Sequence, residues 1–199
     1  MLLYRIFPYL SSAKKGQPGH PLYVHPGQGK GRWDNPAWYL AWYMTHEPTS
    51  AVGEVFANVA IWRDGMFPFP QIPGAQRALG VYGLADDLPY VDLDDAQTVV
   101  ERKMRPSQVI EHNRTYTQGK ALDVYQEKKW NGIRWWSFHR PQWRVWCLWD
   151  IDPECEDVQG LVSPSPIWLF EPPQARLPSR SWLRDLCARS SSRRVDGTP

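Results

Sequence analysis

GRWDNPAWYLAWYMTHEPTSAVGEVF, residues 31–56, sets the architecture of this chain. Its aromatic run at 38–44 is bounded by prolines and predicts a buried strand. The segment after it predicts a helix that begins at Thr49 or Ser50, with Glu54 in one of its first two turns. Apolar residues recur at every fourth position of that helix: Ala51, Val55 and Val59. The sequence therefore predicts a strand that leads directly into an amphipathic helix.

The segments on both sides predict more strands and further helices. Strands are expected at 2–7, 77–84, 90–93, 133–138 and 143–149. A polar turn joins the second of these to the third, and the last two, rich in tryptophan, form a hairpin or two adjacent strands. Helices are expected at 94–100 and 106–129, where a capping residue or a first-turn proline begins each one. Strands, then helices, then strands again indicate an α+β fold rather than a regular βαβ series.

Composition limits the size and the kind of core. The 199 residues are 42% hydrophobic and 22% charged, which fits one globular domain. With 12 Trp and 19 Pro, much of the core must consist of large rings, and long uninterrupted helices are disfavoured. After Asp152 the chain becomes proline-rich, so we expect a folded domain at 1–152 and an extension at 153–199 whose end is flexible.

The charge balance and the cysteine content indicate which partners and which cellular compartment to expect. Lys and Arg number 23 against 21 Asp and Glu, a net charge of +2, so direct binding to nucleic acid is not expected. Three cysteines without a CxxC spacing fit a reducing cytoplasm. No apolar run approaches the roughly 18 residues of a membrane span. The five histidines lack metal-ligand spacing, so no metal is expected.

Four polar residues stand in apolar or aromatic surroundings: Arg32, Tyr39, Glu54 and Ser137. Three of them have an ordinary explanation, because a core ring can keep its hydroxyl at the surface, a helix favours Glu near its start, and a strand can end on Ser. The loop GQGKG, 27–31, has glycines spaced as in loops that approach a phosphate, and a plain flexible loop explains it equally. P-loop, GxGxxG, HExxH and GxSxG signatures are absent from the sequence.

The order and spacing of five segments resemble the RES domain family, named for its Arg, Glu and Ser. These segments are LYRI, GRWDNP with WYLA, PTSAVGEVF, RTYTQGKALDVYQ and IRWWSFHRP, and they cover about residues 2–145. Family members are largely toxins of bacterial toxin–antitoxin pairs that consume NAD. The resemblance implies an ADP-ribosyltransferase-like split β-sheet flanked by helices, with NAD as the substrate and an Xre-type protein antitoxin as the partner.

The resemblance also implies which residues line the NAD site: Arg32, Tyr39, Glu54 and Ser137. Tyr43 is the alternative to Tyr39 as the ring that stacks on the substrate. Nicotinamide leaves NAD as a neutral molecule, so one carboxylate suffices, and Glu54 would stabilise the positive charge that develops on the ribose. Arg32 offers a planar fork of donors to the diphosphate, and the N–H of Gly31 would approach the same phosphates.

Two details of this site stay open at the level of the sequence. Ser137 either holds the ribose or orients Glu54. Four further basic residues either add positive field near an anionic ligand or form a solvated helical face: Arg102, Lys103, Arg105 and Arg114.

Two other functions fit the same residues. With a protein side chain as acceptor in place of water or phosphate, the enzyme would be a protein mono-ADP-ribosyltransferase. Without catalysis, the tryptophan-rich sheet would be a binding module that grips a protein or a single strand by stacking. We favour an enzyme that depletes NAD by hydrolysis or phosphorolysis and is neutralised by an antitoxin.

Overall fold

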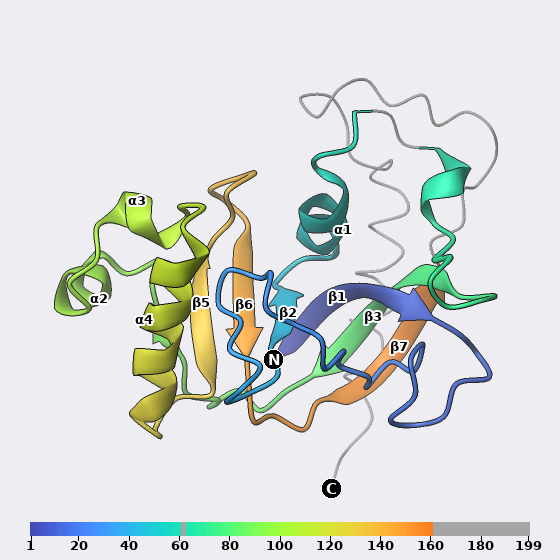
Figure 1. Ribbon diagram of the computed structural model, residues 1–199, viewed down its shortest axis with the longest axis horizontal. Coiled ribbons are helices and arrows are strands. Elements are labelled where there is room, and N and C mark those ends of the chain that lie inside the picture. Colours follow the sequence, from blue (N-terminus) through green and yellow to red (C-terminus); the bar gives the residue numbers. More distant parts are fainter. Residues whose placement is uncertain (61–62, 161–199) are drawn as a thin grey trace, which may run out of the picture.

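The computed structural model describes residues 1–60 and 63–160. These residues form a seven-stranded mixed sheet with four α-helices around it, which confirms the α+β class (Figure 1). The strands are β1 (Leu2–Tyr9), β2 (Trp42–Thr45), β3 (Gln76–Gly83), β4 (Val91–Asp92), β5 (Gly132–Trp136), β6 (Arg144–Leu148) and β7 (Glu154–Gly160). The helices are α1 (Pro48–Phe56), α2 (Ala96–Glu101), α3 (Pro106–Val109) and α4 (Arg114–Gln126), with a short 3-10 helix, η1 (Asp64–Met66).

One junction divides the sheet into two halves. The strand order is β4-β5-β6-β2-β1-β3-β7, and β1 pairs with β3 along its whole length. In contrast, β1 pairs with β2 only through Tyr4 and Thr45. Helix α1 packs against β1 and β2 at this junction, whereas α4 packs against β5 on the other side of the sheet's centre (Figure 1). The two strands therefore separate beside α1.

Helix α1 begins and ends earlier than the sequence predicts. Pro48 is its first residue and Glu47 its N-cap, in place of the two residues expected, because proline has a φ suited to the first turn and lacks an N–H that would have no helical partner there. The buried apolar side chains of the helix include Ala51, Val52 and Phe56. The expected apolar face is therefore wrong for two of its members, Val55 and Val59, which are 39% and 37% exposed.

The aromatic run 38–44 is a strand only in its second part. β2 begins at Trp42, and the chain before it turns so that the N–H groups of Trp38 and Tyr39 both donate to the Asn35 carbonyl, at 2.8 and 2.9 Å. An Asn-Pro pair at 35–36 favours such a turn. Tyr39 and Tyr43 consequently belong to different elements and lie in different surroundings.

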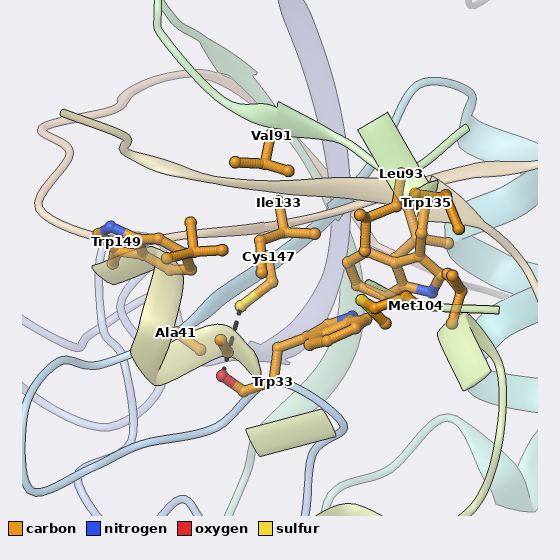
Figure 2. Close-up of a cluster of buried hydrophobic side chains, with 14 of the residues drawn as sticks. Trp33, Ala41, Val91, Leu93, Met104, Ile133, Trp135, Cys147 and Trp149 are labelled. Carbon is orange, nitrogen blue, oxygen red and sulfur yellow. Dashed lines mark hydrogen bonds between the residues drawn. The ribbon is translucent and has the colours of Figure 1, made fainter. Parts of the chain in front are cut away.

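Three tryptophans belong to the largest hydrophobic cluster of the described residues. Figure 2 shows Trp33, Trp135 and Trp149 around the small side chains of Ala41 and Cys147. Trp33 and Trp135 meet edge to face, with ring centroids 5.6 Å apart and an interplanar angle of 68°. Such a contact contributes about 0.5–1.5 kcal/mol beyond the burial of the rings. The cluster supports the loop that precedes β2.

The remaining elements agree with the sequence in part. β5 and β6 form the expected antiparallel hairpin. β3 and β4 are not neighbours, because β4 pairs in parallel with β5 in the other half of the sheet. The expected helix at 106–129 is two helices, α3 and α4, interrupted at 110–113.

The sheet continues past the boundary expected at residue 152. β7 pairs with β3 in antiparallel register, so 154–160 belong to the sheet rather than to an extension. β7 pairs with the edge of β3 through backbone hydrogen bonds, and such pairing cannot be predicted from amino-acid composition. Residues 161–199 of the expected extension lie outside the described residues. Within the described ranges, no helix is long and apolar enough to cross a membrane.

Candidate functional site

A cavity of about 520 Å³ opens where β1 and β2 separate. If their pairing continued beyond Tyr4 and Thr45, the next partners would be Arg5 and Met44, yet these two residues line the cavity instead. The volume is in the range of small-molecule sites. Its lining includes charged and imidazole side chains from distant parts of the chain: Arg32, Glu54, His112, Arg114 and His139.

Glu54 and Ser137 meet at the wall of this cavity. Glu54 lines it from α1, and Ser137, which is 1% exposed, donates a hydrogen bond from Oγ to Glu54 Oε1. The same Oγ accepts the backbone N–H groups of His139 and Arg140, at 2.9 and 3.2 Å. Both lone pairs of the hydroxyl are then occupied, so its single proton is directed to the carboxylate. Ser137 does not line the cavity itself, so it is placed to orient Glu54 rather than to hold a ribose.

Arg32 lies in a loop that reaches the cavity, and side chains of α4 hydrogen-bond to the backbone of this loop. Thr117 Oγ1 donates to the Arg32 carbonyl at 2.6 Å, and Gln118 Nε2 donates to the Gly31 carbonyl at 2.9 Å. The next side chain, Trp33, is fully buried in the aromatic cluster. The segment RTYTQGKALDVYQ is α4, and its first two turns hold the loop that carries Arg32.

Charges of both signs surround Arg32: the guanidinium of Arg114 and the carboxylates of Glu54 and Glu111. Its guanidinium donates to the backbone carbonyl of Glu111, which is neutral. Burial, followed by the nearby charge of Arg114, lowers the pKa of Arg32 to about 10, while Glu54 acts in the opposite direction. Arg32 therefore remains protonated at neutral pH. Arg114 Nη1 is buried and has no hydrogen-bond partner.

Tyr43 lines the cavity, and Tyr39 does not. Tyr39 is 5% exposed in the core, where its hydroxyl donates to the Trp33 carbonyl and its ring centroid lies 4.6 Å from that of Trp149. The turn before β2 directs Tyr39 inward, which corrects its expected place in the site. The Tyr43 hydroxyl donates to Asp34 Oδ1 at 2.8 Å and accepts the Trp33 N–H at 3.0 Å. Only the ring of Tyr43 is left for a ligand.

The glycine loop binds Asp34 rather than presenting its N–H groups to a phosphate. The N–H groups of Gly29 and Gly31 donate to Asp34 Oδ2 at 2.8 and 2.7 Å, and the Gly27 N–H donates to His25 Nδ1 at 2.8 Å. The expected phosphate contact of Gly31 is therefore corrected, since its N–H is already bound. A Cβ on Gly31 would lie 2.4 Å from Asp34 Oδ1, so glycine is required for this close approach.

Sequence reasoning did not single out Asp34, although a carboxylate between a glycine loop and Asn-Pro was a usable signal. It left Arg114 among four basic residues, of which only Arg114 lines the cavity. It also missed His112 and Phe138, whose rings stand 4.8 Å apart at the cavity. No spacing pattern in the sequence connects those two residues.

The number of carboxylates in the cavity limits the reactions that it can catalyse. Among the described residues that line the cavity, Glu54 is the one carboxylate. In the ranges 1–60 and 63–160, no group of three or more His, Cys, Asp or Glu side chains could hold a metal ion. The arrangement suits a reaction in which one fixed negative charge stabilises a developing positive charge.

Comparison with known proteins gives a family and a similar fold. The model of the family described as RES domain matches residues 2–191. No curated protein matches the sequence. Among solved structures, a chain in the crystal structure of the M. tuberculosis MbcT–MbcA toxin–antitoxin complex is similar over 81% of this chain and 84% of that chain, with a TM-score of 0.59. The two sequences are 13% identical, so the likeness is one of fold alone.

Proposed function

This chain belongs to the RES domain family, and we propose that it is a toxin that cleaves the bond between nicotinamide and ribose in NAD. Its place of action is the cytoplasm, and a protein antitoxin neutralises it. The observation that carries the proposal is the hydrogen-bonded pair of Glu54 and Ser137 at the wall of a cavity that also contains Arg32. The family supports NAD as the substrate, and the pair supplies the group that the cleavage needs.

Glu54 provides electrostatic stabilisation of the transition state. The pyridinium nitrogen takes the bonding electrons as nicotinamide leaves, so the leaving group needs no proton and the second carboxylate of ordinary glycosidases is not required. Positive charge then develops on the ribose, and a carboxylate held nearby stabilises it more in the transition state than in bound NAD. Ser137 fixes the carboxylate before the substrate arrives, because its proton has no competing acceptor.

Arg32 and Tyr43 position the substrate. The planar guanidinium of Arg32 matches the geometry of a diphosphate better than a lysine would. Tyr43 contributes a rigid ring, which meets Trp135 edge to face with centroids 6.2 Å apart. Both aromatic residues line the cavity, so they give a flat base an apolar wall.

Expression of the chain in cells tests the proposal. Cells that produce it without an antitoxin are expected to lose NAD and stop growing, whereas cells that produce Glu54→Gln keep both. An intact NAD pool in cells that contain folded wild-type protein contradicts the proposal.

The acceptor is identified with NAD labelled in its adenylate half. Water gives labelled ADP-ribose, phosphate gives its 1″-phosphate, and a transferase leaves the label on a protein band. The first two products support the proposed NAD depletion. The third replaces it with protein mono-ADP-ribosylation at the same site.

The third reading, a non-catalytic binding module, needs tryptophan rings at the surface. Six of the nine tryptophans in the described ranges are buried: Trp33, Trp42, Trp135, Trp143, Trp146 and Trp149. Their rings form core rather than a stacking platform, which favours the enzyme.

The antitoxin has its own test. The similar solved structure is a toxin–antitoxin complex, which supports a protein partner, and the family resemblance points to the Xre type. Co-expression of the product of a neighbouring gene is expected to restore growth and to yield a complex that copurifies. A neighbouring product that binds without restoring growth argues against this assignment.

A further inference from the structure

Arg114 occupies a position that is electrostatically unfavourable in the protein alone. It is the first residue of α4, directly after the N-cap Asn113. The N-terminus of a helix carries partial positive charge, which disfavours a guanidinium there. The charge of Arg114 also lowers the pKa of Arg32, and both side chains line the same cavity. Three sources of positive charge therefore converge at this end of the cavity.

Glu54 and Glu111 act on Arg32 through their charges, but within the described ranges neither carboxylate pairs directly with Arg32 or Arg114. Arg114 Nη1 is buried and makes no hydrogen bond, and Arg32 donates to a backbone carbonyl. Neither arginine forms an ion pair within the part of the chain that the structure describes, unlike three arginines elsewhere: Arg102, Arg134 and Arg144. A buried donor without a partner costs free energy, and a bound anion would remove that cost.

We propose that Arg114 is a second phosphate-binding residue, which clamps the diphosphate of the substrate together with Arg32 and makes the enzyme selective for phosphorylated pyridinium nucleotides. This inference rests on the proposed function and names the substrate class of its site. Two guanidinium groups beside a helix N-terminus match the oxygens of two phosphate groups. Glu54 in the same cavity suits the cationic pyridinium-ribose end of such a molecule. The cavity thus complements a ligand that carries both signs of charge.

The first experiment compares three substrates that differ in phosphate content: NAD, nicotinamide mononucleotide and nicotinamide riboside. Nicotinamide release is measured for the wild type, for Arg114→Gln and for the control Arg105→Gln. Arg105 is exposed and lies outside the cavity lining. Arg114→Gln is expected to lower kcat/KM for NAD about tenfold or more, mainly through KM, because it removes a charged donor to phosphate. The value for the riboside stays within about twofold, and Arg105→Gln changes neither.

The second experiment measures binding without turnover, by calorimetric titration with ADP and with adenosine. The wild type is expected to bind ADP more tightly than adenosine, and Arg114→Gln to reduce that preference about tenfold. A chain that leaves NAD intact but shows this loss keeps the Arg114 site and refutes only the proposed function. An ADP affinity that Arg114→Gln does not change, or an equal loss of kcat/KM for riboside and NAD, overturns the inference.

Discussion

Two carboxylates close to the same cavity, Asp34 and Glu54, have opposite surroundings. Asp34 is 5% exposed and accepts three hydrogen bonds from nearby groups: the N–H groups of Gly29 and Gly31 and the hydroxyl of Tyr43. Glu54 lines the cavity and accepts a hydrogen bond from Ser137. One carboxylate is enclosed by donors of its own loop and strand, and the other faces open space.

The difference separates a structural acid from a functional one. The donors around Asp34 hold the glycine loop in the shape that presents Arg32, and they leave little room for a ligand. Glu54 keeps acceptor capacity for a ribose hydroxyl and negative charge for the developing cation. Changes at Asp34 should therefore appear in stability, and changes at Glu54 in turnover.

Glu54→Gln should cause the largest loss of activity. Glutamine keeps an oxygen that can accept from Ser137 but removes the negative charge, so we expect NAD turnover to fall about 10³-fold. The free energy of unfolding should change by less than about 0.5 kcal/mol. The control is Glu47→Gln, at an exposed acid in the N-cap position of the same helix, which should keep wild-type turnover. A Glu54→Gln protein that retains a tenth of the activity would remove Glu54 from the mechanism.

Asp34→Ala should have the reverse effect. It leaves two backbone N–H groups and a tyrosine hydroxyl without their acceptor, so we expect a loss of about 3 kcal/mol of stability. For a chain of this size that lowers Tm by about 6–12 °C in a calorimetric scan. Asp87→Ala, at an exposed acid, serves as the control and should change Tm little. An unchanged Tm for Asp34→Ala would contradict the structural role.

Ser137→Ala should have an intermediate effect on both quantities. The loss of Oγ removes the donor that orients Glu54 and the acceptor of two backbone N–H groups. We expect kcat to fall about 10- to 100-fold, and stability to fall by about 1 kcal/mol. Ser107→Ala, at an exposed serine, is the matched control for both measurements. A loss of stability without a loss of kcat would make Ser137 part of the fold only.

Tyr39→Phe should have the smallest effect and should leave turnover unchanged. Burial, the largest cause, raises the pKa of Tyr39 above its ordinary value, so the folded protein keeps that proton when the unfolded chain loses it. The stability that this proton contributes is present below about pH 10 and is lost as pH rises above it, by about 1.4 kcal/mol per pH unit.

Urea unfolding at pH 9 and pH 11 measures this contribution. Tyr39→Phe should lose about 1 kcal/mol less than the wild type between the two values. Equal losses would mean that the Tyr39 hydroxyl is not enclosed. Reduced NAD turnover by the folded variant would return Tyr39 to the site.

Local patterns predicted those features that depend on neighbouring residues. The antiparallel pairing of β5 with β6 and the short helix expected at 94–100, which is α2 with Asp95 as its N-cap, follow from short-range rules, and both are present. The contact between Glu54 and Ser137 joins residues 83 positions apart. Residue pattern alone gave each of them an ordinary explanation, and only the family resemblance brought them together.

The errors arise where tertiary contacts override local pattern. A turn at Asn35 separates Tyr39 from Tyr43, although both lie in one aromatic run. The glycine spacing of 27–31 fitted a phosphate loop and a plain flexible loop equally, and in the structure a buried acid three residues on takes two of its N–H groups. The role of Arg114 stayed open in the sequence, because its closeness to Arg32 depends on contacts between α4 and the loop that carries Arg32.

Proton NMR of NAD mixed with the purified chain, in a buffer that contains phosphate, reports which bond is broken. Signals of free nicotinamide are expected to grow with time for the wild type and not to grow for a folded Glu54→Gln protein. Signals of NAD that persist unchanged over hours with folded, antitoxin-free wild type would contradict it. So would the appearance of nicotinamide mononucleotide, which would place the cleavage at the diphosphate.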